Sequence, residues 1–235
     1  IARNARKLQL EADVPNVRLR SVLQLMNRCE FEREHGRQVA RLALSLYDQL
    51  PQRTDLHPAA RELLEYGAML HDIGYHVSYD AHHKHAWYLI KNSELYGFAP
   101  EEIDVLACIA RFHRKRAPQK DDPHLGDMSG TARRTVAYAA AILRVADALD
   151  RSHFHVVESL KVATGKRKAV LRIQAKDDPG MEIWTARQKV GLLERELCRT
   201  VHIETARRAG VRESRRSSVR KGSVRRASAA AAKVR

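Results

Sequence analysis

Histidine is the residue type in this 235-residue sequence that offers the most chemistry. The chain has twelve histidines, and seven of them lie between His71 and His124. Neutral imidazoles bind transition metals such as Mn, Fe, Ni and Zn, whereas carboxylates also suit Mg. Because a carboxylate can bridge two cations, an aspartate among these histidines would let one site hold a pair of ions. The histidine-rich region therefore predicts a site for one or two divalent metal ions.

The dipeptide His71-Asp72 is the centre of the predicted site. It ends an apolar helical pattern just before Ile73-Gly74, where both side chains can turn into a helical bundle. A lone histidine or aspartate at a helix edge is more often a structural group. Here, however, further candidates fall on separate helices, and bundles build metal sites from inward side chains on facing helices. Six ligand positions follow: His35, His71, Asp72, either His82 or His85 one turn apart on the same helix, His113 and Asp147.

We assign the catalytic role to His71 and Asp72, with Asp72 bridging the metals. A metal ion lowers the pKa of a bound water molecule and so makes it a nucleophile at neutral pH. Cationic side chains beside the histidines could neutralise phosphate oxygens and stabilise charge in the transition state. Their alternative role is that of solvated helix ends, where the dipole favours cations. The predicted phosphate-binding residues are Lys84, His85, Arg114, Lys115 and Arg151.

The sequence predicts six helices before residue 150, and five of them carry the candidate ligands. Apolar residues recur at helical spacing, and prolines mark two boundaries, since Pro51 ends one pattern and Pro100 opens another. The stretch 114–130 is rich in Pro, Asp, Gly and Lys and is predicted to be a loop. The first pattern breaks near residues 30–33, so it holds two helices. The helical segments are 17–50, 59–70, 82–91, 100–113 and 131–149, and we expect one helical domain over 17–150.

The pattern changes after residue 150. Residues 156–162 and 169–174 alternate apolar and polar around Thr164-Gly165, which predicts a hairpin. A helix over 183–197 and a short strand over 199–203 complete a small α+β subdomain, 151–204. Residues 205–235 hold eleven Lys or Arg against one acid and no aromatic residue. We predict a disordered basic tail there, which either contacts nucleic acid or polyphosphate non-specifically or has no dedicated partner.

Composition narrows the class of protein. The apolar content of 44% and charged content of 30% are typical of a soluble globular chain, and no apolar run approaches the roughly 18 residues of a membrane helix. We therefore predict a cytoplasmic protein without membrane contact. The three cysteines, which are Cys29, Cys108 and Cys198, fall in apolar patterns and are expected to be reduced core thiols. The chain begins at Ile1 rather than methionine, so we expect that an upstream segment is missing.

The ordered set His35, His71-Asp72 and Asp147 resembles the H…HD…D signature of the HD-domain phosphohydrolases. The further histidines resemble the larger set found in two-metal members, which implies His82 rather than His85 as one ligand and His113 as another. A closer resemblance covers nearly all of residues 5–204. Four segments, 68–75, 82–92, 111–115 and 146–153, resemble the C-terminal half of the exopolyphosphatase/guanosine pentaphosphate phosphatase (Ppx/GppA) family. The resemblance implies a mostly α fold, namely an HD-domain helical bundle with a small α+β appendage.

The same resemblance implies a substrate and leaves alternatives open. It implies a metal-dependent phosphohydrolase that acts on polyphosphate or a phosphorylated guanosine nucleotide, and a homodimer. Family members carry an N-terminal half with phosphate-binding loops, and this chain has no Gly-rich phosphate loop. One alternative is therefore a non-catalytic polyphosphate-binding or dimerisation module. Another is an HD phosphodiesterase or phosphatase that acts on nucleotides.

Overall fold

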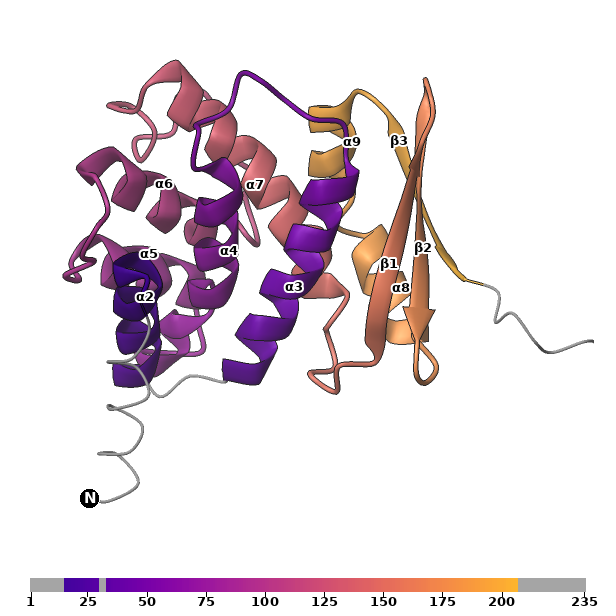
Figure 1. Ribbon diagram of the computed structural model, residues 1–235, viewed down its shortest axis with the longest axis horizontal. Helices are drawn as coiled ribbons and strands as arrows, with labels where there is room; N and C mark the ends of the chain where they lie inside the picture. Colours follow the sequence, from indigo (N-terminus) through magenta and orange to yellow (C-terminus); the bar gives the residue numbers. More distant parts are fainter. Residues whose placement is uncertain (1–14, 30–32, 207–235) are drawn as a thin grey trace, which may run out of the picture.

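The computed structural model describes residues 15–29 and 33–206, and it is mostly helical with a small sheet (Figure 1). The helical part matches the predicted segments, with one additional short 3-10 turn after His71-Asp72. Its elements are α2 (Val17–Arg28), α3 (Arg33–Gln49), α4 (Ala60–Leu70), η1 (Ile73–His76), α5 (His82–Lys91), α6 (Pro100–Arg111) and α7 (Gly130–Ala148). The remaining elements are β1 (Val157–Thr164), β2 (Lys168–Ala175), α8 (Gly180–Arg187), α9 (Gly191–Leu197) and β3 (Thr200–Thr205).

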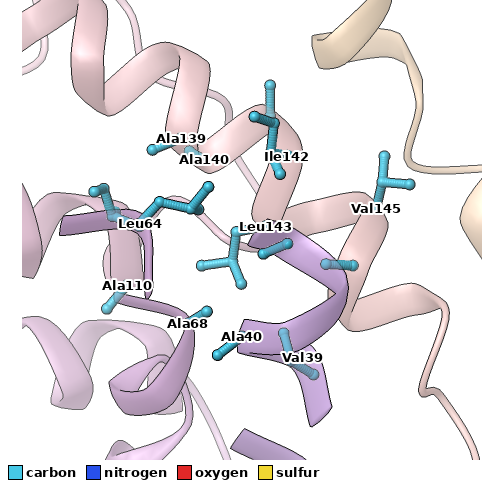
Figure 2. Close-up of a cluster of buried hydrophobic side chains, with 14 of the residues drawn as sticks. Val39, Ala40, Leu64, Ala68, Ala110, Ala139, Ala140, Ile142, Leu143 and Val145 are labelled. Carbon is cyan, nitrogen blue, oxygen red and sulfur yellow. The ribbon is translucent and has the colours of Figure 1, made fainter. Parts of the chain in front are cut away.

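Helix α7 forms the centre of the fold. It crosses the middle of the molecule in Figure 1, and most of its residues are buried, so other elements pack on nearly all of its sides. It contacts α3, α4 and α6 on one side and α8 and α9 on the other. Figure 2 shows Leu143 of α7 among Leu64, Ala68 and Ala40 from neighbouring helices. The alanine-rich sequence thus allows close packing around the helix that carries Asp147.

The sheet has the order β1-β2-β3. Strands β1 and β2 form the predicted antiparallel hairpin, whereas β2 and β3 are parallel and are joined through α8 and α9. The predicted single helix over 183–197 is wrong, because residues 188–190 form a turn between two helices. The apolar residues of this segment continue at helical spacing, which is why one helix was predicted. A single helix would place Gly191 in its interior, where glycine is unfavourable, and in the structure Gly191 instead begins α9. The break lets α8 and α9 each pack separately on α7.

Side chains of α3 attach the sheet to the helical part. Gln38 Nε2 donates to the carbonyl of Val157 at 2.7 Å, and Arg41 donates to the carbonyl of Glu158 at 2.6 Å. Figure 1 shows α3 running alongside β1, which is an edge strand. These contacts satisfy carbonyls that an open edge would otherwise expose to pairing with another chain.

Three further predictions concern the basic tail, membrane-spanning helices and the cysteines. From residue 207 onward the predicted basic tail lies outside the described residues. Across 15–29 and 33–206, the helices are all too short or too polar to cross a membrane. The three cysteines are free; Cys29 and Cys108 are buried as predicted, but Cys198 is exposed at the end of α9. The prediction of a core thiol is wrong there, because Cys198 follows the last buried turn and ends the helix with a φ of 51°.

Candidate metal centre

Four histidines from four segments converge on the carboxylate of Asp72. The Nε2 atoms of His82 and His113 lie 3.1 Å and 3.4 Å from its Oδ1. The Nε2 atoms of His71 and His35 lie 3.3 Å and 3.8 Å from its Oδ2. All five side chains are almost completely buried. Each oxygen of one carboxylate therefore faces its own pair of imidazoles.

Asp147 completes the half of the cluster that surrounds Oδ2 of Asp72. Its Oδ1 lies 3.6 Å from the Nε2 atoms of both His35 and His71. The donor atoms of His35, His71 and Asp147 all lie within 4.8 Å of one another, and so do those of His71, Asp72 and His113. The structure thus brings together all six residues predicted as ligands, arranged around Asp72.

Each histidine is oriented by a hydrogen bond from its other ring nitrogen. A carbonyl or carboxylate oxygen only accepts, so the Nδ1 atom donates a hydrogen to it and the Nε2 atom faces Asp72. This is the arrangement that a metal-binding imidazole requires. The acceptors are the carbonyls of Ala68 for His71 (2.7 Å), Ala110 for His113 (2.6 Å) and Tyr79 for His82 (3.1 Å), and the carboxylate of Asp150 for His35 (2.8 Å).

Several polar atoms of the cluster are buried without a hydrogen-bond partner. They are Nε2 of His35, Nε2 of His71 and Oδ1 of Asp72. Leaving a polar group buried and unpaired costs about 1–3 kcal/mol, and more for a charged group. A divalent cation accepts electron pairs from such atoms, so the residues present fit a metal ion.

The ionisation of the cluster also suits a cation. Burial lowers the pKa of His113 to about 3, so its imidazole is neutral and able to donate its lone pair. Burial opposes a charge on His71, but the carboxylates of Asp72 and Asp147 outweigh it and hold the pKa of His71 well above its usual value. The positive charge that these carboxylates favour is one that a metal ion would supply.

Asp150 is a part of the centre that the sequence prediction missed. It is fully buried, and its Oδ2 accepts from His35 Nδ1 at 2.8 Å while its Oδ1 accepts from the backbone N–H of His155 at 3.0 Å. A carboxylate behind a ligand histidine fixes the orientation of the ring and raises its basicity. The spacing of Asp147 and Asp150, three residues apart at the end of α7, was the available signal.

Asp150→Asn should weaken metal binding by about 10–100-fold, the usual loss when the partner of a ligand histidine is changed. His35 and His155 donate to different oxygens of Asp150, and asparagine replaces one of these oxygens by an amide nitrogen, whose N–H would face a donor. Competition with a chelating dye measures the affinity. The control Asp48→Asn removes a carboxylate that pairs with Arg61 at the surface, and it should bind metal like the parent. Equal affinities for parent and Asp150→Asn would contradict this role.

Gly74 explains how α5 brings His82 to Asp72. A Cβ atom at Gly74 would lie 1.9 Å from the carbonyl oxygen of His82 and 2.6 Å from the backbone nitrogen of Ala86. Only a residue without a side chain therefore permits η1 to lie this close to α5. The glycine that follows His71-Asp72 in the sequence is thus a requirement for the second half of the cluster.

Backbone strain also gathers at the centre. Among the described residues, five non-glycine residues have positive φ, and four of them flank the cluster: Ala81, Lys115, His153 and His155. Such conformations cost energy and persist where the surrounding structure imposes them, often at functional sites. Cys198 is the fifth and lies at the end of α9.

Arg144 of α7 holds one of these strained segments. Its buried guanidinium donates to the carbonyls of Phe112 at 2.7 Å, Lys115 at 2.9 Å and Arg116 at 2.8 Å. These three carbonyls belong to the turn after α6 that carries His113 and Arg114. The sequence prediction also missed Arg144, because its position inside an apolar helix gives no indication of these partners.

A cavity of about 240 Å³ opens onto the cluster. Its floor includes Asp72, His82, His113 and Asp147, and its walls carry three cationic side chains: Arg114, Arg151 and Lys189. Two of these cations were predicted to bind phosphate. Lys189 and the neighbouring wall residue Thr185 were not predicted to bind phosphate, because they belong to the α+β subdomain. Burial lowers the pKa of Lys189. The α+β part therefore contributes to the mouth of the centre.

The other predicted phosphate-binding residues lie elsewhere. Lys84 and Lys115 line a second cavity of about 500 Å³, which shares Arg114 with the first. His85 is half-buried and lines neither cavity, and the position near Asp72 is taken by His82. As a ligand and as a phosphate-binding residue, His85 is thus the least supported of the predictions.

Comparison with known proteins identifies the family of this chain. The family model of Ppx/GppA phosphatase, domain III, matches residues 17–196. The chain is 29% identical over 121 residues to a guanosine-5'-triphosphate,3'-diphosphate pyrophosphatase of Pseudoalteromonas atlantica, which covers 51% of this chain and 24% of that relative. It is 28% identical over 132 residues to the protein of the same name from Pseudoalteromonas translucida, which covers 56% of this chain and 26% of that relative.

The chain matches only about a quarter of the length of these curated relatives. The family model, by contrast, covers most of the chain, from the start of α2 to within α9. The predicted resemblance is confirmed: the chain belongs to the Ppx/GppA phosphatase family.

Proposed function

We propose that this chain is a metal-dependent phosphohydrolase domain of the HD type that acts on phosphoanhydrides. One observation carries the proposal: four Nε2 atoms and two carboxylates converge, with buried atoms left unpaired, at the floor of a cavity walled by cations. Family membership supports phosphate chemistry, because the family model is named for phosphatases.

The proposed ligands form two sets that share Asp72. His35, His71 and Asp147 would hold one ion at Oδ2, and His82 with His113 would hold a second at Oδ1. Mixed imidazole and carboxylate shells accept Mn, Fe, Ni or Zn, and Mg when oxygen donors predominate. When bound, such ions supply a water of lowered pKa and positive charge for the phosphate oxygens.

The cations at the cavity mouth would bind and orient the substrate. Arg114, Arg151 and Lys189 surround the opening and would pair with phosphate oxygens, placing one phosphorus above Asp72. The walls also include the aromatic rings of Tyr75 and Tyr79. The named substrate of the relatives, guanosine triphosphate diphosphate, is rich in phosphoanhydrides, and we propose it or polyphosphate as the substrate class.

A binding module without catalysis is the second candidate. The observation that favours it is that the chain spans only about a quarter of its curated relatives, so chemistry in those proteins can reside in the other three quarters. In that case the same cavity and cations would hold a phosphate chain for a neighbouring domain.

Phosphate release by the purified chain distinguishes the two candidates. The chain is loaded with Mn, Ni or Zn and incubated with polyphosphate, guanosine pentaphosphate or simple nucleotides. The hydrolase proposal expects release that depends on added metal and stops with a chelator. Binding of these compounds without release under any of these metals would reject it in favour of the module.

A further inference from the structure

The aromatic ring of Tyr79 is a feature of the metal-centre cavity that the proposed chemistry does not use. Tyr79 lies in the segment between η1 and α5, lines the cavity that opens onto Asp72 and is 75% exposed to solvent. A single exposed apolar side chain is common on protein surfaces and needs no explanation. One that lines the mouth of a polar cavity, however, is available to contact whatever enters it.

The backbone that carries Tyr79 is fixed to the metal centre. Its carbonyl oxygen accepts a hydrogen bond from Nδ1 of the proposed ligand His82 at 3.1 Å. One residue earlier, the backbone N–H of Ser78 donates to the carbonyl of Gly74 at 3.2 Å. The position of the segment is therefore set by the centre itself, and because the bond to His82 uses the backbone, it does not depend on the side chain of Tyr79.

Three rings lead from the cluster to the surface. The ring of Tyr75 lies 3.9 Å from that of His82, and the ring of Tyr79 lies 5.5 Å from that of Tyr75, measured between centroids. The spacing of the two tyrosines is within the usual range for contacts between aromatic rings. Since His82 is buried, Tyr75 half-buried and Tyr79 exposed, the outer ring is supported from within and open to solvent.

An aromatic ring offers little to a phosphate chain. Its face is the negative side of the ring quadrupole, and it has no charge to pair with phosphate oxygens. Nucleobases, in contrast, stack on tyrosine rings, because every base has a π-face. The same cavity is lined by the cations Arg114, Arg151 and Lys189, which suit phosphates. The cations and the ring of Tyr79 together match the two ends of a nucleotide.

Other exposed aromatic side chains adjoin the cavity wall in sequence. Phe154 is 76% exposed and follows His153, which lines the cavity. Trp184 is 64% exposed and precedes Thr185, which also lines it. Sites for small organic ligands are typically lined by aromatic side chains with a few polar groups. The surroundings of the mouth therefore favour a ligand with an organic part over a purely ionic one.

We infer that Tyr79 is a base-stacking residue, which holds the nucleobase of a nucleoside polyphosphate while the phosphates lie over Asp72. The inference rests on the proposed function for the position of the phosphates, and it favours nucleotides over polyphosphate as the substrate class. Stacking does not depend on the identity of the base, so Tyr79 would separate nucleotides from inorganic phosphate chains rather than one nucleotide from another.

Guanosine triphosphate and inorganic triphosphate are matched probes, because both carry three phosphates in a row and only the first carries a base. Binding of each probe to the full chain is measured by calorimetry in chelator, where the proposed metal-dependent hydrolysis does not occur. The parent should bind guanosine triphosphate at least about fivefold more tightly, although inorganic triphosphate is the more highly charged. One stack of a base on an aromatic ring accounts for a gain of this size.

Tyr79→Ala should weaken the binding of guanosine triphosphate by about tenfold and change that of inorganic triphosphate by no more than about twofold. Tyr79→Phe keeps the ring and should bind both probes like the parent. The matched control is Tyr88→Ala, which removes a tyrosine of α5 that is 60% exposed and lines neither of the two cavities. It should bind both probes like the parent.

The inference is overturned if Tyr79→Ala weakens both probes equally, or neither of them. It is also overturned if the parent binds guanosine triphosphate no more tightly than inorganic triphosphate. A loss in Tyr79→Phe as large as that in Tyr79→Ala would assign the contact to the hydroxyl and contradict stacking. Because the assay needs neither metal nor turnover, failure of the metal-loaded chain to release phosphate would reject the proposed hydrolysis and leave this result intact.

Discussion

Asp72→Asn should reduce phosphate release by at least about 10²–10³-fold, the usual loss when a group that stabilises the transition state is removed. Both oxygens of Asp72 face imidazole Nε2 atoms, at distances of 3.1–3.8 Å. Asparagine keeps the shape, but it removes the negative charge and replaces one acceptor oxygen by an N–H donor. Neither half of the cluster then has the shared carboxylate that the proposed chemistry requires.

The same variant should still bind polyphosphate with an affinity within about threefold of the parent. The cations at the mouth, Arg114, Arg151 and Lys189, are unchanged, and their contacts are largely uniform between ground and transition states. Phosphate release and equilibrium binding are measured on the same preparation. Asp48→Asn is the control for loss of a carboxylate, because Asp48 pairs with Arg61 at the surface. Unchanged release from Asp72→Asn would show that the chemistry occurs elsewhere.

The two halves of the cluster should lose metal separately. His113→Ala removes a donor from the Oδ1 side of Asp72, and His35→Ala removes one from the Oδ2 side. If the parent carries two ions, each variant should retain about one, since a site with one donor fewer loses most of its affinity. Elemental analysis of gel-filtered protein gives the number of ions per chain.

His202→Ala is the matched control for these variants, because His202 is an exposed histidine on β3 outside the cluster. It should carry as much metal as the parent. The division into halves is contradicted if His113→Ala and His35→Ala both lose all metal, because the donors would then act as a single set. It is equally contradicted if neither variant loses any.

Local sequence patterns sufficed to predict the elements that carry the centre. The apolar spacing before His71-Asp72 predicted α4, and Pro100 with its acidic neighbours predicted the start of α6. The alanine-rich segment around Asp147 predicted α7. Each of these signals depends on residues that are close together in the chain, which is why sequence alone was enough.

The choice between His82 and His85 illustrates what local patterns cannot decide. The two residues lie one turn apart on α5, so helical spacing permits either to point inward. The choice depends on how α5 sits against η1, which is fixed by the close approach of Gly74 to His82. That contact joins two elements, and periodicity within one helix does not contain it.

Lys189 and the division between α8 and α9 were missed for a similar reason. Lys189 lies in the turn after α8 and reaches the mouth of the centre because the α+β part packs on α7. The parallel pairing of β3 with β2 likewise depends on the path of the chain through α8 and α9. These features arise from tertiary packing, which overrides local propensity.

Counting metal ions on the folded parent chain tests the central claim most directly. Native mass spectrometry of protein loaded with Mn, Ni or Zn and freed of excess metal should show one to two ions per chain. Asp72→Ala should show none, because both proposed shells include that carboxylate. A parent chain that carries no metal, or an Asp72→Ala variant that carries as much as the parent, would contradict the assignment of these residues as a metal centre.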